Sequence, residues 1–374
     1  MLSLLMWSCI KDEPQNMECD ILSAWVEGED VAQHFFKPSD MTISHVAANT
    51  HELTFTVRSL ADLPDLALLF TLTPGATITP ENGSKQNFRE GPVVYTVASE
   101  DQQWHKTYTV NFRDVPRPKS SFDFEHFDTH EKKGYYRWFE LQADGTRSDI
   151  WATGNEGFYI AKPNAAPSDY PTTMDPEGYD GHCVKLVTRD TGTWGKRFGK
   201  PIAAGNLFLG QFNSKYALTN TLLTTEMGIT MDREPVSVAG YYKYRPGTIF
   251  TDKNGKEVAD RTDEPSIYAV FYTNTDADGT PVMLHGDDVL TSSHIVSKAQ
   301  VASLPPTDVW TRFEMTFASA TPVDLQRLKE QGYNLALVFS SSKTGDTFEG
   351  AVGSTLYIDK VEIVFKAEES DAQQ

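Results

Sequence analysis

Aromatic side chains beside hydrogen-bonding groups are the residues of this chain best suited to bind a sugar. Trp194 lies in the glycine-bracketed segment DTGTWGKR, and Trp151 lies in WATGNEG together with Asn155. An aromatic ring can stack on the apolar face of a sugar while polar neighbours bind its hydroxyls. We therefore expect Trp194 to be the main stacking platform, assisted by Trp151 and Asn155. The alternative is that Trp194 folds back over the end of a β-sandwich.

The segment GYYKYRPG offers a second set of candidates. Side chains alternate between the two faces of a strand, so Tyr242 and Tyr244 share one face while Tyr241 and Lys243 share the other. One face can then pack while the other presents hydrogen-bond donors to a ligand. Lys243 and Tyr244 are therefore further candidates for sugar binding. The alternative is that these tyrosines only pack against the sheet.

Glycoside hydrolysis is the other chemistry to consider, and it requires two carboxyl groups that face each other across a cleft. The chain contains 52 acidic residues, and their spacing selects no pair. It contains no GxSxG motif, and the run Ser340-Ser341-Ser342 before Lys343 is more typical of a polar strand end than of a nucleophile with its base. The sequence assigns no catalytic residue, so enzyme activity stays open and binding is favoured.

Composition excludes one class of partner. With 52 acidic and 33 basic residues, the formal charge of -19 opposes a phosphate backbone, so no nucleic-acid partner is expected. The three cysteines, Cys9, Cys19 and Cys183, form neither a CxxC metal pattern nor a dense disulfide framework. Stability must therefore come from packed cores, and 374 residues are enough for two domains.

The amino terminus resembles a targeting signal. The run MLSLLMWSC ends at Ser8-Cys9, which is typical of a bacterial lipoprotein signal with Cys9 as the lipid acceptor, and it is too short to span a bilayer. Lys11 is followed by two acidic residues, a pattern that resembles the export signal of Bacteroidetes surface lipoproteins. We expect residues 1–9 to be a truncated signal remnant and 10–17 to be a tether. The protein would then be lipid-anchored in the outer membrane and face the cell exterior.

These candidate residues must be positioned by β-strands. Between residues 18 and 114, alternating runs such as HELTFTVRS, GPVVYTVASE and KTYTVNF predict antiparallel strands with one buried face. The length of this region suits an immunoglobulin-like β-sandwich of roughly seven strands. The proline-rich stretch at 115–121 predicts a linker and the boundary between two domains.

The larger region at 122–367 also consists of strand-like runs, including VSVAGYYKYRPG, SIYAVFYTNT and TLYIDKVEIVF. The run LALVF is apolar on both faces, which favours a central strand covered on two sides. Helical character is confined to residues 323–331. The predicted fold class is all-β, with an immunoglobulin-like β-sandwich followed by a larger jelly-roll β-sandwich and a short tail at 368–374.

Six ordered segments of the larger region resemble a known family. They are IWATGNEGFYI, DYPTTMDPEGYDGHCVKLVT, AAGNLFLGQF, VAGYYKYRPG, DEPSIYAVFYTN and FSSSKTGDTFEGAVGSTLYIDKVEIVF. Together they are similar to the putative carbohydrate metabolism domain of Bacteroidetes surface lipoproteins. The order LTPGATITPENGS to VVYTVASEDQQWHKTYTV resembles the immunoglobulin-like domains that follow the lipid anchor in many such proteins. The resemblance implies a jelly roll similar to carbohydrate-binding modules.

The same resemblance indicates one cofactor, a structural Ca2+. Jelly-roll modules of this kind often join an acidic residue near the first strand to an aspartate in the last strand. Glu125 in FDFE and Asp359 in YIDKVEI lie at such places. Carboxylate oxygens suit Ca2+, and several further ligands would be needed.

Together these features favour a surface-anchored lipoprotein that binds polysaccharide or oligosaccharide for capture, alongside other glycan-uptake proteins. A glycoside hydrolase or another carbohydrate-active enzyme on the same fold is the first alternative, because loop acids are abundant. A structural or adhesive surface protein is the second, because two sandwiches in series show no recognisable active site.

Overall fold

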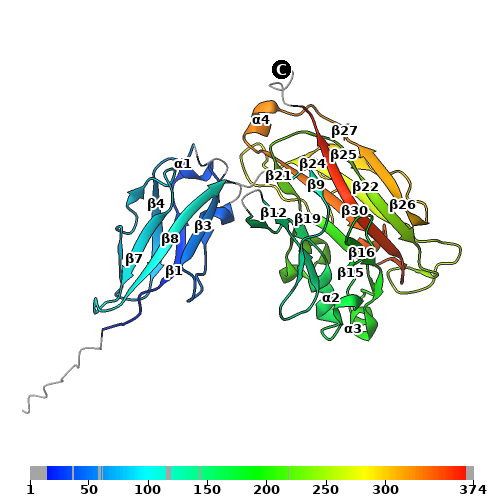
Figure 1. Ribbon diagram of the computed structural model, residues 1–374, viewed down its shortest axis with the longest axis horizontal. Coiled ribbons are helices and arrows are strands. Elements are labelled where there is room, and N and C mark those ends of the chain that lie inside the picture. Colours follow the sequence, from blue (N-terminus) through cyan, green and yellow to red (C-terminus); the bar gives the residue numbers. More distant parts are fainter. Residues whose placement is uncertain are drawn as a thin grey trace, which may run out of the picture. The chain divides into compact units, whose positions relative to one another are not determined.

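The computed structural model describes residues 15–35, 38–57, 60, 62–114, 119–142, 145–217 and 219–367. The chain divides into two compact units, Met1–Val115 and Pro116–Gln374 (Figure 1). The predicted lipid acceptor Cys9, the export segment after it, most of the 115–121 linker and the 368–374 tail lie outside the described residues.

The N-terminal unit is a β-sandwich of two four-stranded sheets. One sheet has the strand order β2-β1-β4-β6, and the other has the order β3-β8-β7-β5. A short helix, α1 (Glu29–Ala32), and a 3-10 turn, η1 (Pro38–Met41), lie between the first two strands. The strands are β1 (Ile21–Val26), β2 (Thr42–Ile43), β3 (Glu52–Val57), β4 (Leu66–Leu72), β5 (Thr77–Thr79), β6 (Lys85–Gln86), β7 (Val93–Ala98) and β8 (His105–Asp114).

Alternation along these strands builds one core between the two sheets. Leu53, Phe55 and Val57 are buried from β3, as the period-two pattern predicts. Phe112 of β8 stacks on Phe55 with ring centroids 5.0 Å apart. Because β3 and β8 run parallel, the prediction of antiparallel strands was wrong for this pair. A hydrophobic pattern fixes which face of a strand is buried, not the direction of its partner. The immunoglobulin-like topology stays a prediction.

The C-terminal unit is a larger β-sandwich, so the predicted all-β fold class is confirmed. Its eight-stranded sheet has the order β14-β19-β28-β24-β25-β27, with β20 paired to β19 and β21 paired to β28. These strands are β14 (Trp151–Ala152), β19 (Asn206–Phe212), β20 (Thr225–Met227), β21 (Ile229–Met231), β24 (Ser266–Thr273), β25 (Ile295–Gln300), β27 (Ala318–Ser319) and β28 (Tyr333–Ser340).

A six-stranded sheet faces it, with the order β15-β16-β30-β22-β26 and β9 paired to β30. Its strands are β9 (Ser121–Phe122), β15 (Thr172–Asp175), β16 (Cys183–Val187), β22 (Pro235–Arg245), β26 (Thr307–Thr316) and β30 (Thr355–Phe365). Four two-stranded sheets complete the unit: β10 (Phe127–Thr129) with β11 (Tyr136–Trp138), β12 (Glu140–Leu141) with β13 (Arg147–Ser148), β17 (Arg189–Asp190) with β18 (Ile202–Ala203), and β23 (Phe250–Thr251) with β29 (Gly350–Ala351).

The eight-stranded sheet is covered on both faces. Leu335, Leu337 and Phe339 of β28 point into the core that the two large sheets share. Ala336 and Val338 point the other way, into a second apolar cluster on the outer face of the sheet. The prediction of a central strand covered on two sides is confirmed for β28. Its outer face is therefore a surface on which loops and helices can build a pocket.

Three helices belong to the described part of this unit. Helix α4 (Leu325–Lys329) falls within the predicted helical segment 323–331, and the carboxylate of Asp324 caps it by accepting hydrogen bonds from two of its backbone N–H groups. Helices α2 (Asn155–Ala161) and α3 (Gly192–Arg197) occupy segments that the sequence predicted as loops, and they lie side by side (Figure 1).

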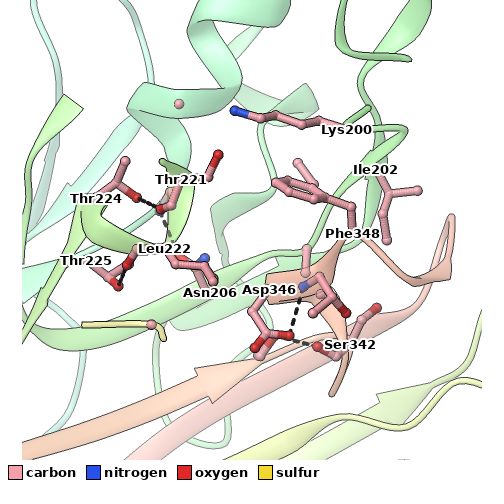
Figure 2. Close-up of a pocket in the computed structure, with 18 of the residues that line it drawn as sticks. Lys200, Ile202, Asn206, Thr221, Leu222, Thr224, Thr225, Ser342, Asp346 and Phe348 are labelled. Carbon is pink, nitrogen blue, oxygen red and sulfur yellow. Dashed lines mark hydrogen bonds between the residues drawn. The ribbon is translucent and has the colours of Figure 1, made fainter. Parts of the chain in front are cut away.

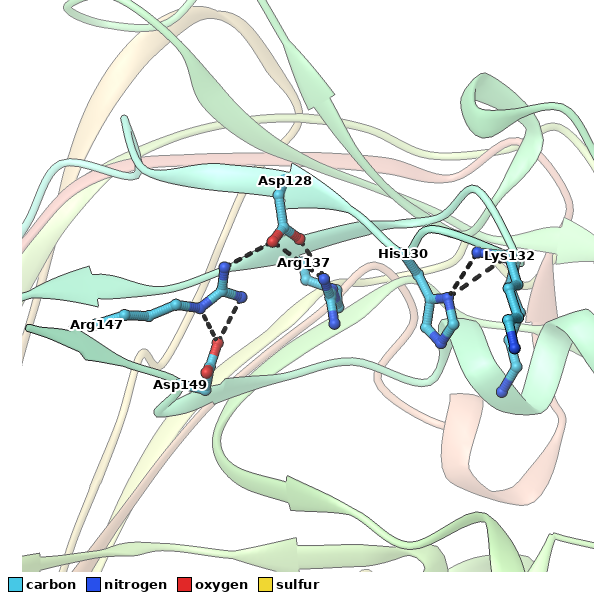
Figure 3. A network of polar contacts seen from close by, with 7 residues as sticks. Asp128, His130, Lys132, Arg137, Arg147 and Asp149 are labelled. Carbon is cyan, nitrogen blue, oxygen red and sulfur yellow. Dashed lines mark hydrogen bonds and ion pairs between the residues drawn. The ribbon is translucent and has the colours of Figure 1, made fainter. Parts of the chain in front are cut away.

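An ion network links two of the small sheets. Asp128 of β10 accepts hydrogen bonds of 2.8 and 3.0 Å from Arg137, its cross-strand partner on β11 (Figure 3). It also accepts one of 2.6 Å from Arg147 of β13, and Arg147 donates another of 2.7 Å to Asp149. One carboxylate thus joins both hairpins.

Replacing Asp128 by asparagine is expected to lower the free energy of unfolding at pH 7 by about 0.5–1 kcal/mol, since partly exposed ion pairs contribute little. Burial acts to raise the pKa of Asp128, but hydrogen bonds from Arg147 and Arg137 outweigh it and hold that pKa below its ordinary value. The stabilisation is therefore complete above the ordinary aspartate pKa of about 3.9 and disappears as the pH falls through the lowered value. Urea unfolding of both proteins at pH 7 and in acid measures this, and a difference that persists in strong acid would contradict it.

Candidate functional site

A pocket of about 520 Å³ lies on the outer face of the eight-stranded sheet. Its floor includes Phe208 of β19, Val338 of β28 and Tyr268 of β24, three strands that are adjacent in the sheet. Residues next to these in sequence, such as Leu207 and Leu337, face the core instead, because side chains alternate along a strand. The volume lies in the range of small-molecule sites.

Trp194 lines this pocket from helix α3. Its side chain is 51% exposed and packs edge-on against Phe198, with ring centroids 5.0 Å apart. Gly195 lets residues 191–200 turn tightly, because a Cβ there would clash with the hydroxyl of Thr191 and lie 2.8 Å from the carbonyl of Lys200. A half-exposed ring is thus available to stack on a ligand.

Three charged residues line the same pocket, namely Lys200, Lys343 and Asp346. Lys200 Nζ lies 5.8 Å from the ring centroid of Phe348 (Figure 2). It also donates a 2.5 Å hydrogen bond to the carbonyl of Ala217. Loss of hydration lowers the pKa of Lys200 and raises the pKa of Asp346. Phe348 has a left-handed backbone with φ of +63°, which non-glycine residues rarely adopt. Such conformations concentrate at binding and active sites.

Several hydroxyl groups of the pocket already donate to the backbone. Thr191, Thr224 and Ser340 donate to backbone carbonyls at 2.5, 2.6 and 2.8 Å. Their oxygen atoms can still accept hydrogen bonds from a ligand. Figure 2 shows Thr221, Leu222 and Thr224 on one side of the pocket, with Lys200 and Phe348 on the other. The site therefore combines an aromatic wall with a limited number of polar groups.

Trp151 and Asn155 do not line the pocket, so the structure does not bring them together with Trp194. Trp151 is 6% exposed in the core, with its ring centroid 5.0 Å from that of Phe122, and its Nε1 donates a 3.1 Å hydrogen bond to Glu140. Asn155 is fully buried, and its amide binds both the N–H and the carbonyl of Thr172, at 3.0 and 2.8 Å. Both residues hold the sandwich together.

The structure separates Lys243 and Tyr244 onto opposite faces of β22, as alternation predicts. Tyr244 is 2% exposed in the core and lines a second pocket, so the structure does not bring it together with Trp194, and its role in binding stays a prediction. Lys243 points to the outer face of the six-stranded sheet and does not line the pocket that contains Trp194. It is therefore not a helper of Trp194. Alternation alone cannot say which face of a strand is open.

Glu125 and Asp359 both bind the loop between β15 and β16. Glu125 Oε1 accepts the backbone N–H of His182 at 2.7 Å, and Oε2 lies 2.7 Å from His182 Nδ1. Asp359 Oδ2 accepts the N–H groups of Tyr179 and Asp180 at 2.7 and 3.1 Å. Over the described residues, no group of three or more His, Cys, Asp or Glu side chains is placed to hold a metal ion. The calcium site remains an untested prediction that these hydrogen bonds do not favour.

Carboxylate pairs suited to hydrolysis are not found in this pocket: among its described lining residues, Asp346 is the one carboxylate. A second pocket of about 630 Å³ is lined by Asp263 and the adjacent Glu264. Asp263 is 2% exposed, and its Oδ2 accepts hydrogen bonds from the hydroxyls of Ser342 and Ser354 at 2.6 and 2.7 Å. These hydrogen bonds connect the segments beside the ends of β28 and β30, in agreement with the interpretation of Ser340-Ser341-Ser342 as a polar strand end.

Sequence reasoning missed Lys200, Phe348 and Asp346, which line the pocket together with Trp194. Their segments are far apart along the chain, and the pairing of Asn206 with Ser340 between β19 and β28 brings them together. The available signal was the two-sided apolar pattern of β28, which indicates that further chain segments cover the outer face of the sheet.

Two family models match this chain. The model described as "Putative carbohydrate metabolism domain" matches residues 123–364, and the model described as "SGBP, N-terminal" matches residues 33–112. A search of curated proteins finds no match. No helix in the described parts of the chain has both the length and the apolar character needed to cross a membrane.

Solved structures from Bacteroides are similar to most of the chain. A crystal structure from Bacteroides thetaiotaomicron VPI-5482, described as a putative glycoside hydrolase, is 38% identical, with a TM-score of 0.70 over 96% of this chain and 100% of that one. Another from Bacteroides vulgatus ATCC 8482, with the same description, is 38% identical, with a TM-score of 0.62 over 67% of this chain and 100% of that one. Since the first family model also spans more than half of the residues, this chain belongs to the Putative carbohydrate metabolism domain family.

Proposed function

We propose that this protein binds carbohydrate in the pocket on the outer face of the eight-stranded sheet. The observation that supports this most is Trp194, a half-exposed ring on helix α3, in one pocket with the charged groups of Lys200 and Asp346. A sugar presents an apolar face to such a ring and hydroxyls to such polar groups. The family membership and the match to the SGBP, N-terminal model support a carbohydrate ligand.

We further propose that the protein is a lipoprotein of the outer membrane, anchored through Cys9 and facing the cell exterior. The lipoprotein-like segment before Cys9, the following lysine and acidic residues, and the SGBP, N-terminal match support this location. At the surface it would hold polysaccharide for neighbouring glycan-uptake proteins. The formal charge of -19 argues against nucleic acid as its partner.

Replacing Cys9 by alanine in the precursor is expected to release the protein from membranes, because the lipid acceptor is lost. Fractionation of cells that express each form measures the release, and a protease added to intact cells tests the orientation. A wild-type protein that the external protease leaves uncut would contradict the outward orientation. Membrane retention of the Cys9→Ala form would contradict lipid attachment at this residue.

A glycoside hydrolase is the second candidate. The Bacteroides structures that are 38% identical to this chain are described as putative glycoside hydrolases, and desolvation shifts the pKa of Asp346 upward, the direction that favours a general acid. A hydrolase of the usual kind also needs a second carboxyl group across the ligand. The lining of the pocket supplies Asp346 alone among the described residues, so binding is the better supported function.

Screening the protein against an array of polysaccharides and oligosaccharides, followed by incubation of each bound glycan with the protein, tests both candidates. Binding without release of reducing ends supports the binding function. Release of reducing ends that is lost in Asp346→Asn supports the hydrolase. If no glycan is bound or cleaved, both candidates are wrong, and the adhesive alternative can then be tested with protein ligands.

A further inference from the structure

The outer face of the six-stranded sheet bears a second group of aromatic side chains, none of which lines the pocket. This aromatic strip consists of Tyr179, Tyr241, Trp310 and Tyr357. Tyr179 is 48% exposed and stacks on Tyr241, with ring centroids 3.8 Å apart and ring planes 11° apart. Trp310 lies edge-on to both Tyr179 and Tyr357, with centroids 6.4 Å from each. The four rings therefore form a continuous chain across the sheet.

Lys243 stands within the aromatic strip. Its Nζ lies 4.5 Å from the ring centroid of Trp310 and 4.7 Å from that of Tyr357. Tyr357 of β30 pairs in register with Lys243 of β22 on one side and Lys185 of β16 on the other. Neighbouring strands are about 4.8 Å apart, so these residues form a row that crosses the strands.

Lys243 differs from the other cations around the aromatic strip, because its ammonium group has no hydrogen bond or ion pair with any residue that the structure describes. The neighbouring cations are each paired with an acid: Lys185 with Asp175 at 3.1 Å, Arg245 with Asp308 at 2.7 Å, Arg312 with Glu314 at 2.6 Å, and Lys360 with Asp180 at 2.9 Å. Among these five cations, Lys243 therefore keeps an ammonium group that is free to bind an anion.

Cation–π contacts that merely stabilise the sheet would explain the position of Lys243. They would not explain why the ring of Tyr179, a loop residue, is held on the aromatic strip. The fully buried carboxylate of Asp359 fixes this loop by accepting hydrogen bonds from the backbone N–H groups of Tyr179 and Asp180, at 2.7 and 3.1 Å. A buried charge thus holds a half-exposed ring on the aromatic strip. This arrangement is preorganised for a flat ligand.

We propose that the aromatic strip binds an anionic polysaccharide, a chain of sugars that bear carboxylate or sulfate groups. The sugar rings stack on Trp310, Tyr179 and Tyr357, and Lys243 forms a charge-assisted hydrogen bond with the acidic group. This site is separate from the pocket and goes beyond the function proposed for it. Carboxylated and sulfated polysaccharides share the two features that the aromatic strip recognises, which are sugar rings that can stack and negatively charged groups.

The test is calorimetry of the full chain with three soluble probes: polygalacturonate, alginate and chondroitin sulfate. At least one probe is expected to bind, with an affinity that falls as salt is added. Lys243→Met keeps the apolar stem of the side chain and removes its charge, so it should weaken that binding about tenfold or more. Lys256→Met, which removes an exposed lysine from a loop, is the matched control and should bind as the wild type does.

Several results would overturn the proposal. It is wrong if none of the three probes binds, or if Lys243→Met binds as tightly as the wild type. Equal binding of a single-stranded DNA would show general attraction of polyanions in place of sugar recognition. The same titration with Trp194→Ala separates the two sites: loss of polyanion binding there would assign the probe to the pocket. If the pocket binds no glycan, the probe should still bind to the aromatic strip, and its binding should still depend on Lys243.

Discussion

Replacing Trp194 by alanine is expected to weaken glycan binding roughly tenfold to a hundredfold, which corresponds to about 1.5–3 kcal/mol of lost apolar contact. The ring is half exposed on α3 and lines the pocket, so a bound sugar would bury it. Since the ring contributes little to the core, the melting temperature should stay close to that of the wild type. Calorimetry with a glycan chosen from the array measures the affinity, and circular dichroism measures the melting temperature.

Trp104→Ala is the matched control for this experiment. Trp104 is 58% exposed, comparable to Trp194, and it belongs to the N-terminal unit. Its removal is expected to leave glycan affinity unchanged, which separates loss of the platform from a general effect of removing an exposed tryptophan. If Trp194→Ala binds as well as the wild type, the sugar contacts another surface. If the variant unfolds, Trp194 stabilises the domain and the alternative reading of this residue was right.

Replacing Asp263 by alanine is expected to lower the free energy of unfolding by about 3–5 kcal/mol, because several buried donors lose their acceptor at once. Its Oδ2 accepts hydrogen bonds from the hydroxyls of Ser342 and Ser354 and from the backbone N–H of Ala351, at 2.6, 2.7 and 2.8 Å. Desolvation raises the pKa of Asp263, so part of its stabilising effect is already offset by the cost of burying a charge. Asp263→Asn removes that charge and should therefore cost less than Asp263→Ala.

Asp308→Ala is the control for the stability measurement. Asp308 forms an ion pair with Arg245, but both side chains are about three-quarters exposed, at 77% and 74%. Exposed pairs contribute about 0–1 kcal/mol, so this substitution should change stability little. Urea unfolding followed by tryptophan fluorescence compares the variants. Equal losses for Asp263→Ala and Asp308→Ala would contradict a structural role for the buried network.

The sequence predicted strands better than it predicted their partners. The period-two pattern of Leu53, Phe55 and Val57 identified the buried face of β3, but nothing in it shows that β3 runs parallel to β8. Helix α4 was predictable because Asp324 caps an amphipathic segment. Helices α2 and α3 were missed because their glycines lower helix propensity. Contacts made after folding, such as the close packing at Gly195, allow α3 to form.

Residue type alone does not predict which side chains line the pocket. Trp194 and Trp151 have the same side chain and similar glycine-rich surroundings, yet one is half exposed and the other is buried against Phe122. Local sequence does not reveal which of them the two sheets will cover. Lys200 and Phe348 meet because β19 pairs with β28, a long-range contact that no local motif encodes. Trp194 could therefore be chosen as a candidate from the sequence, whereas its neighbours in the pocket could not.

A crystal structure of the protein with the tightest-binding glycan from the array would show where the sugar binds. We expect a sugar ring in van der Waals contact with Trp194, inside the pocket formed by β19, β24 and β28, with hydroxyls within hydrogen-bond distance of Lys200 or Asp346. A neutral glycan bound at full occupancy on another surface, with the pocket empty, would contradict this expectation.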